Sequence, residues 1–406
     1  MNTNIKLACL FFITIVAGCT KDKSQIREQS SETQKRVNAP GITFSPAIGV
    51  NYSAVSISGN FSTIPGANVV KFNGKTGIIN SVAADKIVVT VPATATTGKV
   101  TVTTNNTTLT SATDFKVLKL LKQDTYQTPL GVRYFIFSRS GNGAAYIVTQ
   151  TQKIYLINSN GTIKLFYSVP PKIVDGSYVE DYRIHGIDTD GDGNVIISQI
   201  QFGSLEGSND IIKSIVLKIT PAGKVTQVLS TQKNPVYALM WDRTGSNLIY
   251  MLGDFSMNKF TNTGQKIVLP WPVPAYGGAF VKDKYDNYYT LDANQIKRVG
   301  TSGSITTISG RQNIAGETDG QIQQATFTSY STIAVDSAQN IFMLHLTNSL
   351  NNQKVRMVNT AGYASTLSFP TAGDNERLYA DPYTNNLYHV LRSDNKQSTI
   401  TRYAFK

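Results

Sequence analysis

The segment from residue 188 to residue 195 carries the clearest pattern for binding chemistry. Its oxygen donors alternate along the chain and are Asp188, Asp190, Asp192 and Asn194. Alternating oxygens followed by a glycine and an apolar residue match the first eight places of a calcium loop, whose twelfth place holds a bidentate Glu. That twelfth place is Gln199 here, so the strongest ligand is missing. Two interpretations stay open: an acidic turn without a metal, and a calcium site formed by these four residues.

Catalytic chemistry has weaker support in the sequence. The three histidines are His185, His345 and His389, and no two of them have the short spacing of a zinc site. The chain also contains no Gly-x-Ser-x-Gly elbow and no phosphate-binding glycine loop. We therefore assign no catalytic residue and favour a non-catalytic protein. A hydrolase or lyase that uses a bound divalent cation stays as an alternative, with His185 nearest the expected centre of the fold.

The N-terminus has the features of a secretory signal. Lys6 is followed by an apolar run from Leu7 to Ala17, which is too short to span a bilayer, and then by a small residue before Cys19. Residues 16–19 resemble the bacterial lipobox, in which the cysteine is lipidated and becomes the first mature residue. The resemblance implies a signal peptide over residues 1–18 and a lipid anchor on Cys19.

The segment after the signal is expected to be a tether. Residues 19–40 are polar and lack an apolar period, as is typical of a flexible linker. The second residue after Cys19 is Lys21, not Asp, so nothing resembles an inner-membrane retention signal. We expect sorting to the outer membrane, on its periplasmic or cell-surface face. Cys9 lies in the removed segment, which leaves no second cysteine for a disulfide.

A repeat organises the rest of the chain from residue 119 onward. Its first landmark is an apolar strand that ends in Asp, a polar turn, and a second strand that begins near Asn. The copies are Asp188 to Asn194, Asp242 to Asn247, Asp283 to Asn287, Asp336 to Asn340 and Asp381 to Asn386, with a weaker one at Ser138. They recur every 41 to 54 residues, the length of a four-stranded propeller blade. Asp and Asn suit these turns because their side chains bond nearby backbone and tolerate left-handed conformations.

The second landmark of the repeat is an apolar residue followed four places later by Gly, before a last short strand. The copies are Ile157 to Gly161, Ile219 to Gly223, Phe260 to Gly264, Val299 to Gly303 and Val358 to Gly362. Five copies against six of the first landmark leave the last blade one strand short. We therefore predict that Lys119 to Tyr126 pairs with the strand ending near Phe405 and closes the ring.

The sequence of one blade resembles the NHL-repeat family of propellers. That family carries a Gly-Asp-Gly-type lead-in, an Ala-x-Phe, and a unit of strand, Asp, turn, Asn and strand. Here the three parts are Gly316 to Gly320, Ala325 to Phe327, and Asp336 to Asn340. The resemblance implies a six-bladed ring and no particular chemistry, because the family serves both binding and catalysis.

Residues 41–118 form a separate region rich in Val, Ile, Thr and Gly. Short alternating strands, such as Val55 to Phe61 and Ile87 to Pro92, are separated by Gly, Pro and Asn turns, as is typical of an immunoglobulin-like sandwich. The region closely resembles an IPT/TIG domain. The predicted fold class is all-β, with this sandwich followed by a six-bladed β-propeller over residues 119–406. The linker is expected to be short and the sandwich to lie beside blade six.

The amino-acid composition limits the kinds of partner that the protein is expected to bind. The formal net charge is +12, but no run of basic residues forms the patch that nucleic acid binding requires. Twenty Tyr accompany a charged fraction of only 16%, and exposed aromatic rings such as those expected at Tyr276 and Tyr285 stack on sugars or on proteins. Tandem all-β lipoproteins of this kind resemble surface glycan-binding or accessory proteins of Bacteroidota polysaccharide-uptake systems. We expect a membrane-anchored binding module for glycan, or for another surface protein, with no cofactor apart from calcium.

Membrane attachment is predicted to depend on the sulfur of Cys19. A multiply acylated cysteine is a stable anchor, so the unmodified sequence should fractionate with membranes. The substitution Cys19→Ser should release the protein or block its processing, as measured by cell fractionation and immunoblotting. Recovery of the unmutated protein from the soluble periplasmic fraction would contradict the lipobox interpretation.

Overall fold

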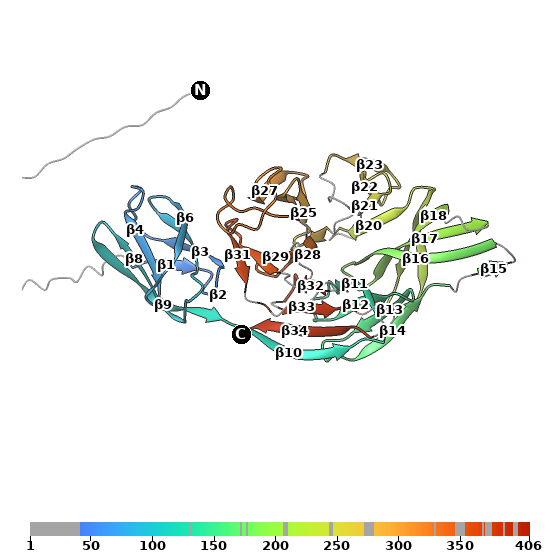
Figure 1. The fold of residues 1–406 in the computed structure, drawn as a ribbon, viewed down its shortest axis with the longest axis horizontal. Helices are drawn as coiled ribbons and strands as arrows, with labels where there is room; N and C mark the ends of the chain where they lie inside the picture. Colours follow the sequence, from blue (N-terminus) through green and yellow to red (C-terminus); the bar gives the residue numbers. More distant parts are fainter. Residues whose placement is uncertain are drawn as a thin grey trace, which may run out of the picture. The chain divides into compact units, whose positions relative to one another are not determined.

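The computed structural model describes residues 41–129, 131–170, 173–175, 178–205, 210–242, 247–271, 280–328, 330–345, 354–367, 369, 376–384, 386–392 and 397–406. Within these ranges the regular structure consists of β-strands, which confirms the all-β class predicted from the sequence (Figure 1). In the same ranges, no helix has the length and apolar character needed to cross a membrane. The predicted signal peptide, Cys19 and the tether lie outside the described residues.

Residues 43–118 form two packed sheets. The first has the order β1 (Thr43–Ser45), β3 (Ala54–Ser58), β7 (Lys86–Thr90) and β6 (Ile78–Val82). The second has the order β2 (Ile48–Val50), β9 (Thr107–Leu118), β8 (Gly98–Thr104), β4 (Asn68–Phe72) and β5 (Lys75–Thr76). Alternate residues of β4 are buried, as expected of strands with one face in a core. The rings of Phe72 and Phe115 meet edge to face at 5.1 Å in the centre of that core.

Six further sheets form the propeller. Blade one contains β11 (Val132–Phe137), β12 (Ala145–Thr149), β13 (Lys153–Ile157) and β14 (Ile163–Ser168). Blade two contains the four strands β16 (Tyr178–Thr189), β17 (Val195–Leu205), β18 (Asp210–Ile219) and β19 (Val225–Gln232), and the short β15 (Ile173–Asp175) pairs with the start of β16. Blade three contains β20 (Val236–Trp241), β21 (Asn247–Leu252), β22 (Met257–Thr261) and β23 (Lys266–Leu269).

The remaining three blades complete the set. Blade four contains β24 (Val281–Lys282), β25 (Tyr288–Asp292), β26 (Gln295–Val299) and β27 (Ile305–Gly310). Blade five contains β28 (Tyr330–Val335), β29 (Ile341–His345), β30 (Lys354–Val358) and β31 (Ala364–Leu367). Blade six contains β32 (Glu376–Ala380), β33 (Asn386–Leu391), β34 (Thr399–Phe405) and β10 (Leu120–Gln127). Apolar clusters join each blade to the next, and one of them joins blade six back to blade one.

The recurring Asp and Asn form a hydrogen-bonded turn. In blade five, Asp336 Oδ1 accepts hydrogen bonds from the backbone N–H groups of Ala338 and Asn340 at 2.9 and 2.8 Å. Asn340 Nδ2 donates to the other carboxylate oxygen at 2.9 Å. Asp283 and Asn287 repeat this arrangement in blade four. The pair therefore satisfies buried backbone donors at the end of the first strand, which explains why both residue types recur.

The turn of blade two corrects the register given above. Asp190, and not Asp188, accepts the backbone and side-chain hydrogen bonds of Asn194, at 2.9 and 2.8 Å. Asp190 is thus the equivalent of Asp336, because each lies four residues before its Asn partner. Asp188 lies two residues earlier, within β16, and its side chain contacts Lys282 and the backbone of Trp241 and takes no part in the turn.

The glycines of the second landmark share one backbone conformation. Gly161, Gly223, Gly264, Gly303 and Gly362 have φ angles between 78° and 87°, in the left-handed region. Each lies in the turn between the third and fourth strands of its blade. Glycine adopts this conformation without the steric cost that a side chain brings, so the sequence spacing reports a hairpin directly.

The ring is closed by the pairing predicted from the strand count. β10 runs antiparallel to β34, from Leu120 opposite Phe405 to Gln127 opposite Thr399 (Figure 1). The backbones of Lys119 and Lys406 extend the ladder with two hydrogen bonds of 2.6 and 2.9 Å. β34 therefore lies between β10 and β33 as an interior strand. The prediction of closure by both chain segments is confirmed.

The sandwich is connected to the propeller through a single residue, because β9 ends at Leu118 and β10 begins at Leu120. Its side chains contact blade five as well as blade six, beside which the sequence placed the sandwich. Asn359, just after β30, donates from Nδ2 to Tyr52 O at 2.9 Å and to Thr90 Oγ1 at 3.0 Å. The apolar cluster between blades five and six also packs against Tyr52. The loop before β3 thus contacts blade five, whereas the covalent link enters blade six through β10.

Deleting Thr399 to Lys406 should unfold the propeller as a whole. The deletion removes an interior strand and leaves the edges of β10 and β33 without partners, a configuration prone to aggregation. The expected result is loss of the propeller's cooperative thermal transition, measured by calorimetry. Hydrogen exchange should still show protected amides in β4, β7 and β8, because the sandwich has its own core. A truncated protein that keeps the full melting temperature would refute the closure.

Candidate ligand-binding cavity in the propeller

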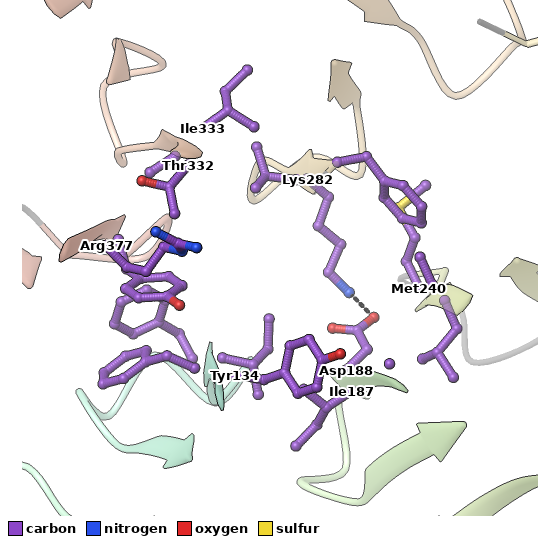
Figure 2. A pocket seen from close by; sticks show the side chains of 18 of the residues that line it. Tyr134, Ile187, Asp188, Met240, Lys282, Thr332, Ile333 and Arg377 are labelled. Atoms are coloured by element: carbon purple, nitrogen blue, oxygen red, sulfur yellow. Dashed lines mark hydrogen bonds and ion pairs between the residues drawn. The ribbon is translucent and has the colours of Figure 1, made fainter. Parts of the chain in front are cut away.

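A cavity of about 940 Å³ lies among the first strands of the six blades. Residues of β11, β16, β20, β24, β28 and β32 line it, so every blade contributes (Figure 2). Sites for small molecules range from about 300 to 1,000 Å³, and this cavity falls within that range. The cavity is therefore large enough for a small or oligomeric ligand.

Local irregularities of three strands supply side chains at one end of the cavity. The register of β11 shifts between Val132 and Tyr134, and equivalent shifts occur in β16 and β20. The residues at these β-bulges are Arg133, His185 and Tyr237, and all three line the cavity. A bulge leaves one residue out of the ladder and re-aims its side chain. The repeated bulge thus places polar and aromatic groups where a regular strand would continue its alternation.

Two more arginines belong to the same end of the cavity. Arg377 lies near the start of β32, and Figure 2 shows its side chain pointing into the cavity. Arg392 follows β33 and donates from Nε to Val132 O at 2.7 Å, so it lies next to the first bulge. Burial lowers the pKa of Arg377, and the charge of Arg392 acts in the same direction. In the β32–β33 ladder Arg377 lies opposite Val390, two residues before Arg392, so the two guanidinium groups belong to the same part of the lining.

Aromatic side chains lie beside these arginines. The rings of Phe135 and Tyr379 stack at 5.0 Å with an interplanar angle of 26°, and both line the cavity. Burial raises the pKa of Tyr379, while Arg377 and Arg392 oppose that shift. The cavity wall thus combines an apolar ring surface with hydroxyl and guanidinium hydrogen-bond donors.

The opposite end of the cavity has its charges paired. Lys282 contacts the carboxylate of Asp188, which also accepts a hydrogen bond from the backbone N–H of Trp241 at 2.7 Å (Figure 2). Burial lowers the pKa of Lys282 to about 8, although the charge of Asp188 raises it. Nearby, Arg139 pairs with Asp286 at 2.7 Å. This end is therefore held together by internal ion pairs.

The four residues of the predicted calcium loop have separate surroundings. Asp188 contacts Lys282, and Asp190 pairs with Lys218 at 2.8 Å besides holding Asn194. Asp192 is exposed in the turn. In the described part of the chain, no group of three His, Cys, Asp or Glu side chains is arranged to hold a metal ion. Calcium binding at this loop stays a prediction, which titration with calcium itself would test.

The other residues singled out from the sequence have different outcomes. His185 lines the cavity, as its position before the Asp landmark suggested. His389 instead lies against Glu376, with 3.2 Å between Nε2 and Oε2, within blade six. Tyr285 is 49% exposed, as predicted. Tyr276 and the side chain of His345 lie outside the description.

The cavity arginines were missed by the sequence reasoning. Arg133 and Arg377 lie five and four residues before the Ser138 and Asp381 landmarks, so a basic residue at that distance was a usable signal. Arg392 had no such signal, since it follows a second strand, β33, and its hydrogen bond to Val132 O joins it to another blade.

Similarity to known proteins is confined to solved structures, since no family profile and no curated protein match the sequence. A protein of unknown function from Bacteroides thetaiotaomicron is 14% identical, with 90% of this chain and 98% of that chain covered and a TM-score of 0.48. An auxiliary nutrient binding protein from the same organism is 14% identical over 90% and 98%, with a TM-score of 0.45. The β-propeller domain of Myceliophteria thermophila Cps50 (Swd1) is 11% identical over 71% and 100%, with a TM-score of 0.43. At these values the likenesses carry no conclusion about a ligand.

His185 should make stability depend on pH below neutrality. Burial, followed by the charges of Arg133 and Arg183, lowers its pKa from 6.5 to about 4 in the folded protein. The unfolded chain therefore binds the proton more readily, and stability is lost as the pH falls from about 6.5 to about 4. Urea unfolding gives the free energy of unfolding of the wild type and of His185→Phe, and the difference between the two should change by about 1 to 3 kcal/mol over this pH range. A difference in free energy of unfolding that stays constant with pH would contradict a lowered pKa for His185.

Proposed function

We propose that the protein is a non-catalytic binding module that holds a saccharide in the central cavity of its propeller and serves nutrient uptake at the outer membrane. The observation that carries the proposal is the cavity wall itself, in which the half-buried rings of Tyr134, Tyr237 and Tyr379 lie beside several hydrogen-bond donors. Sugars present apolar C–H faces and polar edges, so they are recognised by this combination.

The outer parts of the wall extend the same chemistry. Tyr237 and Thr332 bring a phenol and a hydroxyl to the cavity from β20 and β28. The ring of Tyr237 lies 5.7 Å from that of His185, which leaves the two groups as neighbours on one side. A ligand in the cavity would therefore meet ring faces and polar atoms from several blades at once, as small-molecule sites commonly require.

The rest of the chain fits a role at the cell surface. The sequence pattern around Cys19 supports lipid anchoring, and residues 19–40 supply a polar tether. The sandwich then separates the propeller from the tether, and the single residue between β9 and β10 limits the freedom of the junction. On this proposal the anchor, tether and sandwich present the cavity to ligands outside the membrane.

Saccharide binding should be detectable and should depend on the cavity. A glycan array and affinity gels with plant, microbial and host polysaccharides would find the ligand, and titration calorimetry would measure its affinity. Tyr237→Ala should weaken that affinity about tenfold, because it removes one aromatic wall. Tyr285→Ala removes an exposed ring of the turn after β24 and serves as the matched control. Failure of every glycan in the screen would refute the proposal in favour of a protein-interaction role.

A further inference from the structure

We propose that the ligand of the central cavity carries an anionic oxygen group, a carboxylate or a sulfate ester on a sugar, which Arg133, Arg377 and Arg392 bind together. This inference rests on the proposed function, since it names the chemical class of ligand for the same cavity.

The lining has an excess of positive charge. Its cationic side chains among the described residues are Arg133, Arg377, Arg392 and Lys282. Asp188 is the one carboxylate in that lining, and it already contacts Lys282 at the opposite end. Three guanidinium groups therefore face the cavity with no acidic partner in the described lining. Like charges held together in a partly buried site are unfavourable, and an anionic ligand would relieve that repulsion.

The arginines are oriented but retain donors for a ligand. Arg392 uses Nε on Val132 O, and Arg377 uses Nη1 on Glu376 O, each at 2.7 Å. A guanidinium carries five N–H donors, so one bond to the backbone fixes the group and leaves most of the fork free. The planar fork matches carboxylate, phosphate and sulfate oxygens in pairs. The groups thus form a preorganised receptor for an oxyanion.

Other buried arginines of this chain show what a structural role looks like. Arg356 is fully buried, donates to Thr326 O and Thr318 O at 2.6 and 2.7 Å, and pairs with Asp319 at 3.0 Å. Arg139 likewise pairs with Asp286. In both cases the buried guanidinium has a carboxylate of the chain as its partner. The cavity arginines depart from this arrangement, which points to a partner from outside the chain.

His185 adds a polar group with unused capacity at the same end. Its Nε2 is buried and has no hydrogen-bond partner among the described residues. The centroid of the imidazole ring lies 6.2 Å from that of Phe202 and 5.7 Å from that of Tyr237, and the charge of Arg133 is nearby. A buried polar atom without a partner costs free energy, which a bound ligand would recover. The half-buried ring of Tyr379 belongs to the same lining, so the combined site suits an acidic sugar.

The test compares acidic and neutral forms of one ligand by titration calorimetry on the full chain. The probes are trigalacturonic acid, its fully methyl-esterified form, and a sulfated chondroitin disaccharide. The expected result is that at least one acidic probe binds about tenfold or more tightly than the neutral ester. Its affinity should fall when sodium chloride is raised from about 0.05 to about 0.5 M, since screening weakens charge contacts.

The arginine dependence is tested with a series of substitutions. Arg377→Gln should weaken binding of the acidic probe about 10- to 100-fold, and Arg377→Lys should retain part of it because charge is kept without the fork. Arg133→Gln provides a second variant at another blade, and unchanged melting temperatures show that the variants fold. Arg311→Gln removes the same charge from an exposed position outside the lining and should bind as the wild type does.

The outcomes separate the two proposals. Binding of the uronate probe alone assigns a carboxylate, and binding of the sulfated probe alone assigns a sulfate ester, provided either depends on Arg377. Neutral glycans that bind, lose affinity in Tyr237→Ala and keep it in Arg377→Gln would overturn the anion site but leave saccharide binding in place. Acidic probes that bind with no effect of Arg133→Gln and Arg377→Gln would also overturn it. No binding by any glycan would remove both proposals.

Discussion

The propeller depends on the backbone pairing between β10 and β34. These strands come from opposite ends of the propeller sequence, and their ladder supplies the outer strand of blade six. Without it, blade six would have three strands with β34 as an unpaired edge, and the apolar clusters joining it to blades five and one would lose part of their cover. The cavity depends on the same closure, because its wall takes a first strand from every blade. A ring that opened at one blade would lose the arrangement of Arg377, Arg392 and Arg133, which lie on both sides of that junction.

The first strands of the blades differ between their two ends, and this difference organises the cavity. At the end that leads into the Asp turns, buried carboxylates satisfy backbone donors and neighbouring cations, as at Asp336 and Asp188. The chain uses its polar groups there for internal structure. At the other end the strands bulge, and side chains leave the regular alternation. Irregular backbone on a rigid scaffold is where binding groups are commonly found, because the scaffold fixes them while the local geometry can vary.

The buried cationic groups at one end of the cavity lower the stability of the fold, and packing elsewhere offsets this loss. Burial and mutual repulsion disfavour the charged state of Arg377, and burial disfavours protonation of His185. Such groups do not stabilise the protein by themselves, so their presence together is more readily explained by a ligand than by folding. Stability comes instead from the apolar clusters between blades and from the separate core of the sandwich.

The sequence by itself determined the all-β class, the Asp turns and glycine hairpins, and the missing strand that β10 supplies. These features are local or countable: a turn residue bonds its own backbone, a left-handed position calls for glycine, and strands can be numbered. The spacing pattern assigned the turn of blade two to Asp188, although Asp190 makes its hydrogen bonds, because either carboxylate fits the distance to Asn194. Only the tertiary structure brought Arg133, Arg377 and Arg392 to one end of a cavity and placed Asp188 against Lys282. Arg133 lies 244 residues before Arg377 and Asp188 lies 94 residues before Lys282, and a bulge decides the direction of the Arg133 side chain. The spacing of Arg133 and Arg377 before their landmarks was a usable signal for their place in a blade, but the contact of Asp188 with Lys282 and the position of Arg392 beside Val132 arise only when the sheets pack around one axis.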